Sequence, residues 1–267
     1  MAREARLLDN PLPKDTDFTD EEVKEIQSRL NALVPPLPPS FTDPLFIAFS
    51  ANYLPALATA LRTLSRETQR KAFSTLVQIL SLLPDPERDP YFRRFLGSSQ
   101  FAGLPTLLAS AFGGGVAWLR PSGPGSICNL LFYALVWCDP AMGDDKQTCI
   151  DKDTRDALAA RVAEIQADPS FPRIDATQRA QVARLAKTLA TLTNIPGAGM
   201  PAPVWLNAQR GLAENSVHGL NDCAVCFEED EALFLCSKCK TVKYCSQECQ
   251  LRGWKQGHKI RCFETTF

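Results

Sequence analysis

The cysteines of this chain are concentrated in residues 223–267, and this clustering constrains the fold of that region more than any other feature. Seven of the ten cysteines lie between Cys223 and Cys262 in a chain of 267 residues. Clustered thiols are typical of metal sites in a reducing compartment, whereas a secreted chain would use them as disulfides. The N-terminus has no apolar run of secretory length, so we expect an intracellular protein that binds metal through these cysteines.

The candidate ligands fall into four short pairs. These pairs are Cys223-x2-Cys226, Cys236-x2-Cys239, Cys245-x3-Cys249 and His258-x3-Cys262. A structural zinc ion takes four tetrahedral ligands, so eight ligands fill two closed sites and leave no open position for a catalytic water. A module of about 45 residues buries too little apolar surface to fold on that alone, so zinc should supply most of its folding free energy.

The spacing also predicts the local structure of this module. Residues separated by four positions lie on one face of a helix, so the last two pairs are expected on short helical turns. Phe234 and Leu235 precede the second Cys-x2-Cys pair, and Lys240-Thr-Val-Lys-Tyr244 follows it. We therefore expect a small hairpin around that pair.

The arrangement resembles the MYND zinc finger, in which two Cys-x2-Cys pairs are followed by an aromatic residue, Cys-x3-Cys and His-x3-Cys. Tyr244 immediately precedes Cys245, as in that family. The segments Tyr244-Cys-Ser-Gln-Glu-Cys-Gln250 and Trp254-Lys-Gln-Gly-His258 are also similar to it. The resemblance covers about 40 residues of the chain. A RING domain also interleaves its ligands, but its central Cys-x-His step is missing here.

The residues alone leave open which pairs share a zinc ion. The interleaved topology of the MYND family implies that the first and third pairs hold one zinc, and that the second and fourth hold the other. The implied ligand sets are Cys223, Cys226, Cys245 and Cys249 for one ion, and Cys236, Cys239, His258 and Cys262 for the other.

MYND domains are protein-interaction modules, and several bind peptides of the form Pro-x-Leu-x-Pro. The resemblance implies that Gln250 and Trp254 line a peptide groove, with Ser246 as a weaker candidate. An indole offers proline rings a flat apolar surface, and an amide can hydrogen-bond an extended backbone. The alternative is that Trp254 belongs to the core of the finger. Gly253 departs from the acid that the family often has before this tryptophan.

A segment of this chain, Pro35-Pro-Leu-Pro-Pro39, itself fits the Pro-x-Leu-x-Pro form. It could bind the finger of its own chain and inhibit it, or bind the finger of another copy. The alternative is a proline-rich connection between two helices, which is a common use of this composition.

The rest of the chain has the pattern of an all-helical domain, and 45% hydrophobic residues are enough for a sizeable core. Thr19 and Glu22 form a capping box before a first helix. The further helical segments are residues 44–63, 66–83, 88–97, 103–112, 125–138, 151–167 and 175–193, with Pro55 expected to kink or split the first. We predict a mostly α fold, either an irregular helical bundle or an armadillo-like or HEAT-like stack.

The domain organisation follows from these segments. We predict a flexible N-terminal segment over residues 1–18, a helical domain over 19–193, a linker rich in Pro and Gly over 194–221 and the finger over 222–267. Within the linker, Trp205 and Leu206 are expected to finish the last helix or to dock on a neighbouring domain.

Charge and hydropathy narrow the partners. The formal net charge is −1, so no overall positive field draws in nucleic acid, although the finger has a local excess of basic residues. These are Lys238, Lys240, Lys243, Arg252, Lys255, Lys259 and Arg261. Nucleic-acid binding stays as a secondary alternative, and a solvated face is the simpler interpretation. The longest apolar run, residues 127–137, is too short to span a bilayer, so we expect no membrane partner.

An enzyme is the main rival. Some MYND proteins are lysine methyltransferases with a SET domain, but the Asn-His-x-Cys segment of that domain is missing here. The only histidine outside the finger is His218, and no Ser/His/Asp set can be assembled. Cys128 and Cys138 are predicted to pack in the core, while Cys149 could be exposed. We predict a non-enzymatic adaptor in the nucleus or cytoplasm, with transcriptional regulation as one setting and an enzyme activity of the body as the alternative.

Overall fold

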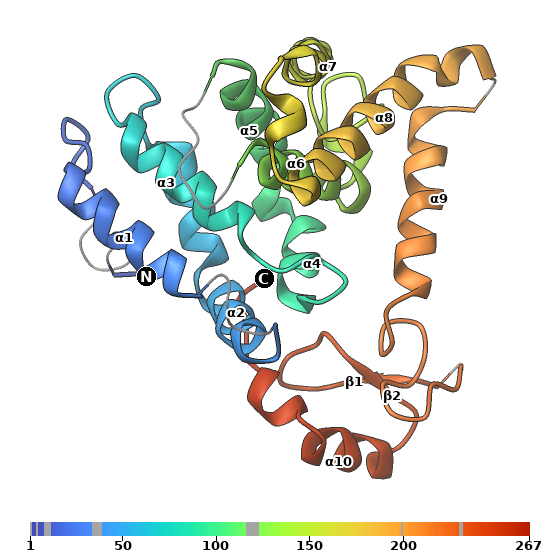
Figure 1. Cartoon of the computed structure of the whole chain (residues 1–267). Coiled ribbons are helices and arrows are strands. Elements are labelled where there is room, and N and C mark those ends of the chain that lie inside the picture. The colour runs from blue at the N-terminus through green and yellow to red at the C-terminus, as the bar shows by residue number, and fades with distance from the viewer. Residues whose placement is uncertain are drawn as a thin grey trace.

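The computed structural model of the chain is predominantly helical, with the C-terminal finger at one end of a larger helical body (Figure 1). It describes residues 2–3, 5–7, 12–33, 39–115, 123–198, 200–229 and 232–267. The α-helices in these residues are α1 (Asp20–Leu33), α2 (Pro39–Thr63), α3 (Arg70–Ser81), α4 (Pro90–Leu96), α5 (Leu104–Gly113), α6 (Pro124–Trp137), α7 (Lys152–Ala167), α8 (Ala176–Ala198), α9 (Ala202–Asn215) and α10 (Gln247–Lys255). The strands are β1 (Phe234–Leu235) and β2 (Lys243–Tyr244), and the 3-10 turns are η1 (Ser99–Phe101), η2 (Pro140–Met142), η3 (Phe171–Arg173) and η4 (His258–Arg261).

The start of α1 follows the predicted capping box. The backbone N–H of Glu22 donates to the Thr19 hydroxyl over 3.2 Å, and the N–H of Thr19 donates to the Glu22 carboxylate over 2.7 Å. Two N–H groups at the helix start are thereby satisfied, which fixes the point at which the chain becomes helical.

The core of the body is built around α6, which packs against α3, α4, α5, α8 and α9. Its Leu131, Ala134 and Leu135 are completely buried. Cys128 and Cys138 are completely buried as well, which confirms that they are packing residues. A helix surrounded by this many others is typical of an irregular bundle, because in a stack each repeat contacts only its neighbours.

The N-terminal segment differs from the prediction that residues 1–18 are flexible. Its described apolar residues Ala2, Ala5, Leu7 and Phe18 are buried in the core of the body. The Gln69 side-chain amide donates to the carbonyl oxygens of Pro13 and Thr16, both over 2.9 Å. The Asp17 carboxylate accepts from backbone N–H groups in the first turn of α3. The segment is therefore held by burial and by capping of a helix far along the chain.

The region predicted as a linker, residues 194–221, is also mostly helical. α8 continues to Ala198, and α9 fills most of the remainder. Pro203 lies in the first turn of α9, where proline is tolerated because that turn has no intrahelical partner for its N–H groups. The prolines and glycines of residues 194–221 had suggested a linker. The prediction of a linker from this composition is therefore wrong.

α9 docks on the body through an apolar contact and a set of hydrogen bonds. Leu206 is buried in the core and Trp205 packs against it. The Arg210 guanidinium donates to the carbonyl oxygens of Val136, Trp137 and Cys138 over 2.8 to 3.1 Å. A cation at the C-terminal end of α6 satisfies carbonyl groups that the helix itself leaves unpaired. Along the chain, a short stretch after α9 joins the body to the finger.

The proline-rich segment Pro35–Pro39 falls largely outside the described residues. Pro35, Pro36, Leu37 and Pro38 are among the residues that the structure does not describe, and Pro39 is the first residue of α2. α2 then runs through Pro55 without a break. The expectation that this proline could split the helix is therefore wrong.

One helix among the described residues is long and apolar enough by length and composition to cross a membrane. It is the Thr42–Thr63 part of α2, and half of it is buried inside the molecule. Such burial is typical of a core helix, because a membrane-spanning helix needs its apolar surface for lipid.

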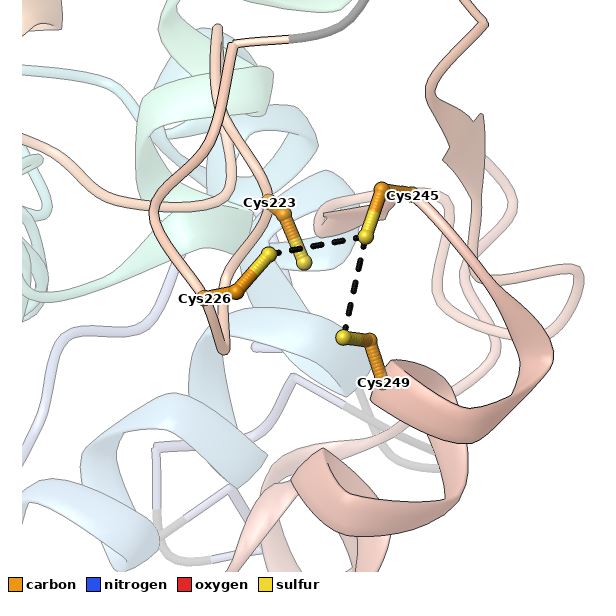
Figure 2. Close-up of side chains that lie close together, drawn as sticks. All are labelled: Cys223, Cys226, Cys245 and Cys249. Carbon is orange, nitrogen blue, oxygen red and sulfur yellow. Dashed lines mark hydrogen bonds between the residues drawn. The ribbon is translucent and has the colours of Figure 1, made fainter.

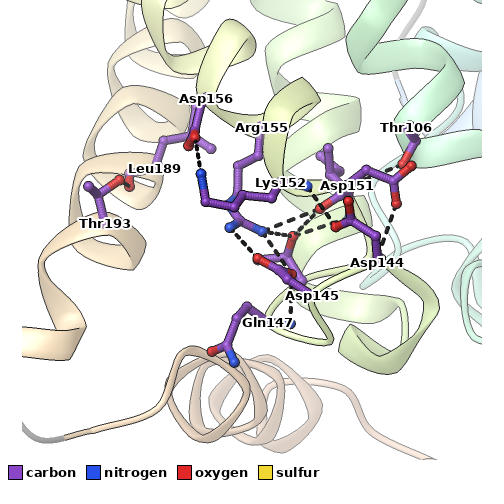
Figure 3. Close-up of polar contacts among 12 residues, drawn as sticks. Thr106, Asp144, Asp145, Gln147, Asp151, Lys152, Arg155, Asp156, Leu189 and Thr193 are labelled. Atoms are coloured by element: carbon purple, nitrogen blue, oxygen red, sulfur yellow. Dashed lines mark hydrogen bonds and ion pairs between the residues drawn. The ribbon is translucent and has the colours of Figure 1, made fainter.

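A network of polar contacts folds the loop before α7 against the body (Figure 3). The Arg155 guanidinium forms a half-buried ion pair with Asp145 over 2.6 Å and donates to the Thr148 hydroxyl over 3.0 Å. Cys149 lies in this loop and is 1% exposed, with its thiol donating to the carbonyl oxygen of Ala134. The expectation that Cys149 is exposed is therefore wrong, because the network turns the loop inward.

Candidate functional site

The finger is built from a two-stranded hairpin, α10 and η4. β1 and β2 pair antiparallel in the register Phe234 with Tyr244 and Leu235 with Lys243, which confirms the predicted hairpin. α10 begins after Ser246, whose hydroxyl oxygen accepts from the N–H of Cys249 over 3.2 Å. The third cysteine pair thus spans the start of a helix, and the last pair spans a 3-10 turn, with His258 as its first residue and Cys262 directly after it.

The first group of ligands consists of four cysteines whose sulfurs face a common centre (Figure 2). The group is Cys223, Cys226, Cys245 and Cys249, and its sulfurs all lie within 4.8 Å of one another. The Sγ of Cys245 is 3.5 Å from that of Cys226 and 3.6 Å from that of Cys249. Tetrahedral zinc with bonds of about 2.3 Å places sulfurs about 3.8 Å apart, so the group fits a zinc ion.

The second group brings three cysteines and a histidine together. It consists of Cys236, Cys239, His258 and Cys262, again with all ligand atoms within 4.8 Å. The Nε2 atom of His258 is 3.4 Å from the Sγ of Cys236 and 3.6 Å from that of Cys239. The Thr241 hydroxyl donates to the Cys239 sulfur over 3.2 Å. These two groups are the ligand sets that the MYND topology implies.

The electrostatics of the first group favour a bound cation. Burial disfavours the thiolate of Cys223, but the N–H groups of Cys226, Cys245 and Val225 oppose it and lower the pKa of Cys223 to about 6. The neighbouring thiols of Cys226 and Cys223, with burial, raise the pKa of Cys245 to about 12. Four thiols this close cannot all ionise by themselves, and a divalent cation offsets the repulsion between them.

Tyr244, the aromatic residue before Cys245, forms the small core of the finger. It is buried and lies edge-on to the zinc-ligand candidate His258, with ring centroids 6.0 Å apart. Gly253 packs directly against it, since a Cβ atom at this position would lie 2.9 Å from the Tyr244 ring. A side chain at position 253 would therefore force Tyr244 or Val225 to shift.

The peptide-binding candidates lie on α10. Trp254 is 38% exposed and lies edge-on to His258, with ring centroids 6.0 Å apart. Gln250 precedes it by one helical turn and is partly exposed. The Ser246 oxygen, in contrast, already caps α10. The structure thus brings Gln250 and Trp254 together on one helix face and gives Ser246 a structural role.

The body takes part in the finger through Tyr91 of α4, a contribution that the sequence did not reveal. Its hydroxyl oxygen lies 2.9 Å from the carbonyl oxygen of Arg261 and accepts from the N–H of Phe263 over 2.5 Å. Tyr91 also packs, together with Ile47 and Ala51 of α2, against the cluster of buried finger cysteines.

The C-terminal tail extends this contact. It returns from the finger toward α2 and α4 (Figure 1), and the Phe267 ring lies edge-on to Phe95 at 5.0 Å. The Arg94 guanidinium donates to the carbonyl oxygen of Cys239 over 3.3 Å. The finger is therefore docked on the helical body by both its second ligand group and its tail.

These features define a small two-site zinc-binding module attached to a helical scaffold. Comparison with protein families identifies residues 223–262 as a MYND finger, so the chain is a MYND-type zinc finger protein.

Several curated proteins resemble the chain over a limited stretch. Ubiquitin carboxyl-terminal hydrolase 19 of Arabidopsis thaliana is 46% identical over 41 residues, which cover 15% of this chain and 6% of that protein. Ubiquitin carboxyl-terminal hydrolase 16 of the same plant is 33% identical over 90 residues, 34% of this chain and 8% of that protein. N-lysine methyltransferase SMYD2 of Homo sapiens is 43% identical over 42 residues, 16% of this chain and 10% of that protein. The matches thus span a tenth or less of these relatives. No solved structure matches the chain.

Proposed function

We propose that this protein is a non-enzymatic adaptor whose MYND finger binds proline-rich segments of partner proteins, with the helical body as its scaffold. The observation that carries the proposal is the half-exposed Trp254 indole on α10, beside a candidate zinc ligand. A rigidly held aromatic surface of this kind suits an extended proline-rich peptide, which loses little conformational entropy on binding.

The neighbouring residues support the same function. Gln250 lies one turn before Trp254 and offers both a donor and an acceptor to a peptide backbone without internal hydrogen bonds. The His258 ring packs edge-on against the indole. Because His258 is one of the four ligand candidates of the second group, a bound metal ion would fix its position. Zinc would thus keep the recognition surface in shape without taking part in any reaction.

The named activities of the relatives are hydrolase and methyltransferase activities. The match to this chain covers a tenth or less of their length, so we propose neither activity for the helical body. An intracellular adaptor, in the nucleus or the cytoplasm, agrees with the reduced thiols that zinc requires.

The test is a binding measurement on the full-length, zinc-loaded protein. A fluorescein-labelled Pro-Pro-Leu-Pro-Pro peptide should bind, and Trp254→Ala should weaken it by roughly tenfold or more, since a buried aromatic contact is worth more than about 1.4 kcal/mol. Leu251→Ala is the matched control, because Leu251 is a large apolar residue on the same helix and 61% exposed.

Equal weakening by Trp254→Ala and Leu251→Ala, with two zinc ions still bound, would count against a groove at Trp254. The same assay examines the segment Pro35–Pro39. If this segment competes for the finger, Leu37→Asp should strengthen binding of the added peptide, whereas unchanged affinity would make the segment a connection between α1 and α2.

A further inference from the structure

A cavity of about 280 Å³ lies where α4, the C-terminal end of α6, α9 and the hairpin of the finger meet. We call it the junction pocket. Its charged lining residues are mostly basic and come from both parts of the molecule. They are Arg93, Arg94 and Arg210 from the body, Lys240 and Lys243 from the finger, and a single acid, Glu214.

The basic residues of the junction pocket outnumber the acidic residues near them. None of its five basic side chains forms a salt bridge with another residue in the part of the chain that the structure describes. The arginines donate instead to neutral carbonyl oxygens, as Arg94 does to Cys239 over 3.3 Å and Arg210 to Trp137 over 2.9 Å. Glu214 lines the pocket, and Asp89 and Glu87 also act on the charge of Arg93. Three acids against five bases leave an excess of positive charge in a partly enclosed space.

The junction pocket also holds the buried cation Arg93, which donates to the carbonyl oxygen of Pro86 over 2.6 Å, and one buried hydrogen-bond donor. Arg93 is 9% exposed, and burial lowers its pKa because the guanidinium is separated from water. The Trp137 indole N–H is buried and has no hydrogen-bond partner among the described residues. A buried cation and an unused donor are both stabilised by an incoming anion.

We propose that the junction pocket binds acidic side chains of a peptide segment in a partner protein. Carboxylates match planar guanidinium groups and can pair with several of them at once. Lys240 lies between β1 and β2 and Lys243 is the first residue of β2, so a bound acidic segment would contact the finger and the body together. The inference rests on the proposed role in protein binding, but it concerns a different surface from that of Trp254.

A nucleic acid fits these observations less well. A polyanion is drawn by a long basic surface, whereas the chain as a whole has a formal charge of −1 and the junction pocket is small. A short acidic segment needs only a local excess of positive charge.

The experiment uses the full-length, zinc-loaded protein and a fluorescein-labelled hexaglutamate peptide, with hexaglutamine as the neutral comparison at the same ionic strength. We expect hexaglutamate alone to bind. Reversing both lysines, in Lys240→Glu with Lys243→Glu, should weaken it by roughly tenfold or more, because attraction becomes repulsion in a partly enclosed site. Glu214→Gln should strengthen it about two- to fivefold, a gain that unfolding cannot produce.

The matched control is Lys238→Glu with Lys259→Glu. It changes the charge of the finger equally at two exposed residues outside the junction pocket and should leave the affinity within about twofold. Equal weakening by both double variants, or equal binding of hexaglutamine, would overturn the proposal. So would displacement by inorganic phosphate at lower concentration than by free glutamate, or tighter binding of a single-stranded oligonucleotide.

The two binding sites can fail separately. If the junction pocket is correct and the proline-rich groove is not, Trp254→Ala leaves hexaglutamate binding intact and the proline-rich peptide does not bind any variant. If the reverse holds, Lys240→Glu with Lys243→Glu leaves proline-rich peptide binding intact and hexaglutamate binds no better than hexaglutamine.

Discussion

The helical body and the MYND finger are held together by different means. The body buries apolar side chains around α6, whose Leu131, Ala134 and Leu135 have no exposed surface. The finger has a hairpin with strands of two residues each, one short helix and a core centred on Tyr244. Its shape therefore depends on ligand atoms that a metal ion can draw together, because its apolar burial is too small.

The contact between the two parts modifies this contrast. Ile47, Ala51 and Tyr91 of the body pack against the buried cysteines of the finger. Apolar side chains of the body therefore complete the small core of the finger, and α2 and α4 cover its second ligand group. A zinc module in a longer chain can thus be part of the tertiary structure of its neighbour.

Metal removal should produce the largest effect, and it should affect the finger and the helical body differently. Structural zinc contributes about 10–16 kcal/mol per site in small fingers, so a strong chelator should unfold the finger while the body keeps its helices. Elemental analysis should give two zinc ions per chain before chelation, and far-ultraviolet circular dichroism should retain most of its helical signal afterwards.

The matched substitutions are Cys239→Ser and Cys128→Ser, which change two completely buried cysteines, one in each part. We expect Cys239→Ser to lose the second zinc and Cys128→Ser to keep both. Loss of helicity throughout the chain on chelation would show that the fold of the body depends on the finger. The two parts would then not be stabilised independently.

Tyr91→Phe should produce an intermediate effect at the contact itself. It removes the hydroxyl that accepts from the Phe263 N–H and lies beside the Arg261 carbonyl oxygen, which leaves partly buried backbone groups unpaired. Such a loss costs about 1–3 kcal/mol. Hydrogen exchange should become faster in residues 261–267 while the zinc content stays unchanged. Tyr53→Phe, a hydroxyl removal elsewhere in the body, should leave exchange in this tail unaltered; equal exchange in both variants would show that Tyr91 does not hold the finger.

Asp89, which caps α4 just before Tyr91, should produce the smallest effect near neutral pH. Burial raises its pKa from 3.8 to about 7, although the Ser50 hydroxyl and the N–H groups of Phe92 and Tyr91 favour its carboxylate. The unfolded chain therefore releases this proton at lower pH than the folded protein. The free energy of unfolding falls as the pH rises from about 4 to about 7 and levels off above the folded pKa.

Asp89→Asn should remove this dependence. Between pH 6 and pH 8 the wild type should lose about 1 kcal/mol relative to the variant in urea unfolding, and the comparison cancels any common effect of zinc release. Asp168→Asn, at an exposed carboxyl group, should run parallel to the wild type over this range. Parallel curves for Asp89→Asn and the wild type would mean that Asp89 is ionised in the folded protein.

The amino-acid sequence determined those features that depend on neighbouring residues along the chain. The eight ligand candidates follow from their spacing, and the start of α1 follows from Thr19 and Glu22. The helical class and most helix positions follow from apolar periodicity. Each of these is set by geometry within a few residues, so one sequence is enough to predict it.

Only the tertiary structure decided which distant surfaces meet. Groups far apart in the sequence decide the packing of the described residues before α1, the docking of α9 within the expected linker and the contact of Tyr91 with the finger. The spacing did not decide which cysteine pairs join; the structure groups them as the MYND topology implied. The sequence identifies apolar and basic residues, but it does not say which residues they will contact. Those contacts form only when the whole chain packs, as at the junction pocket between the body and the finger.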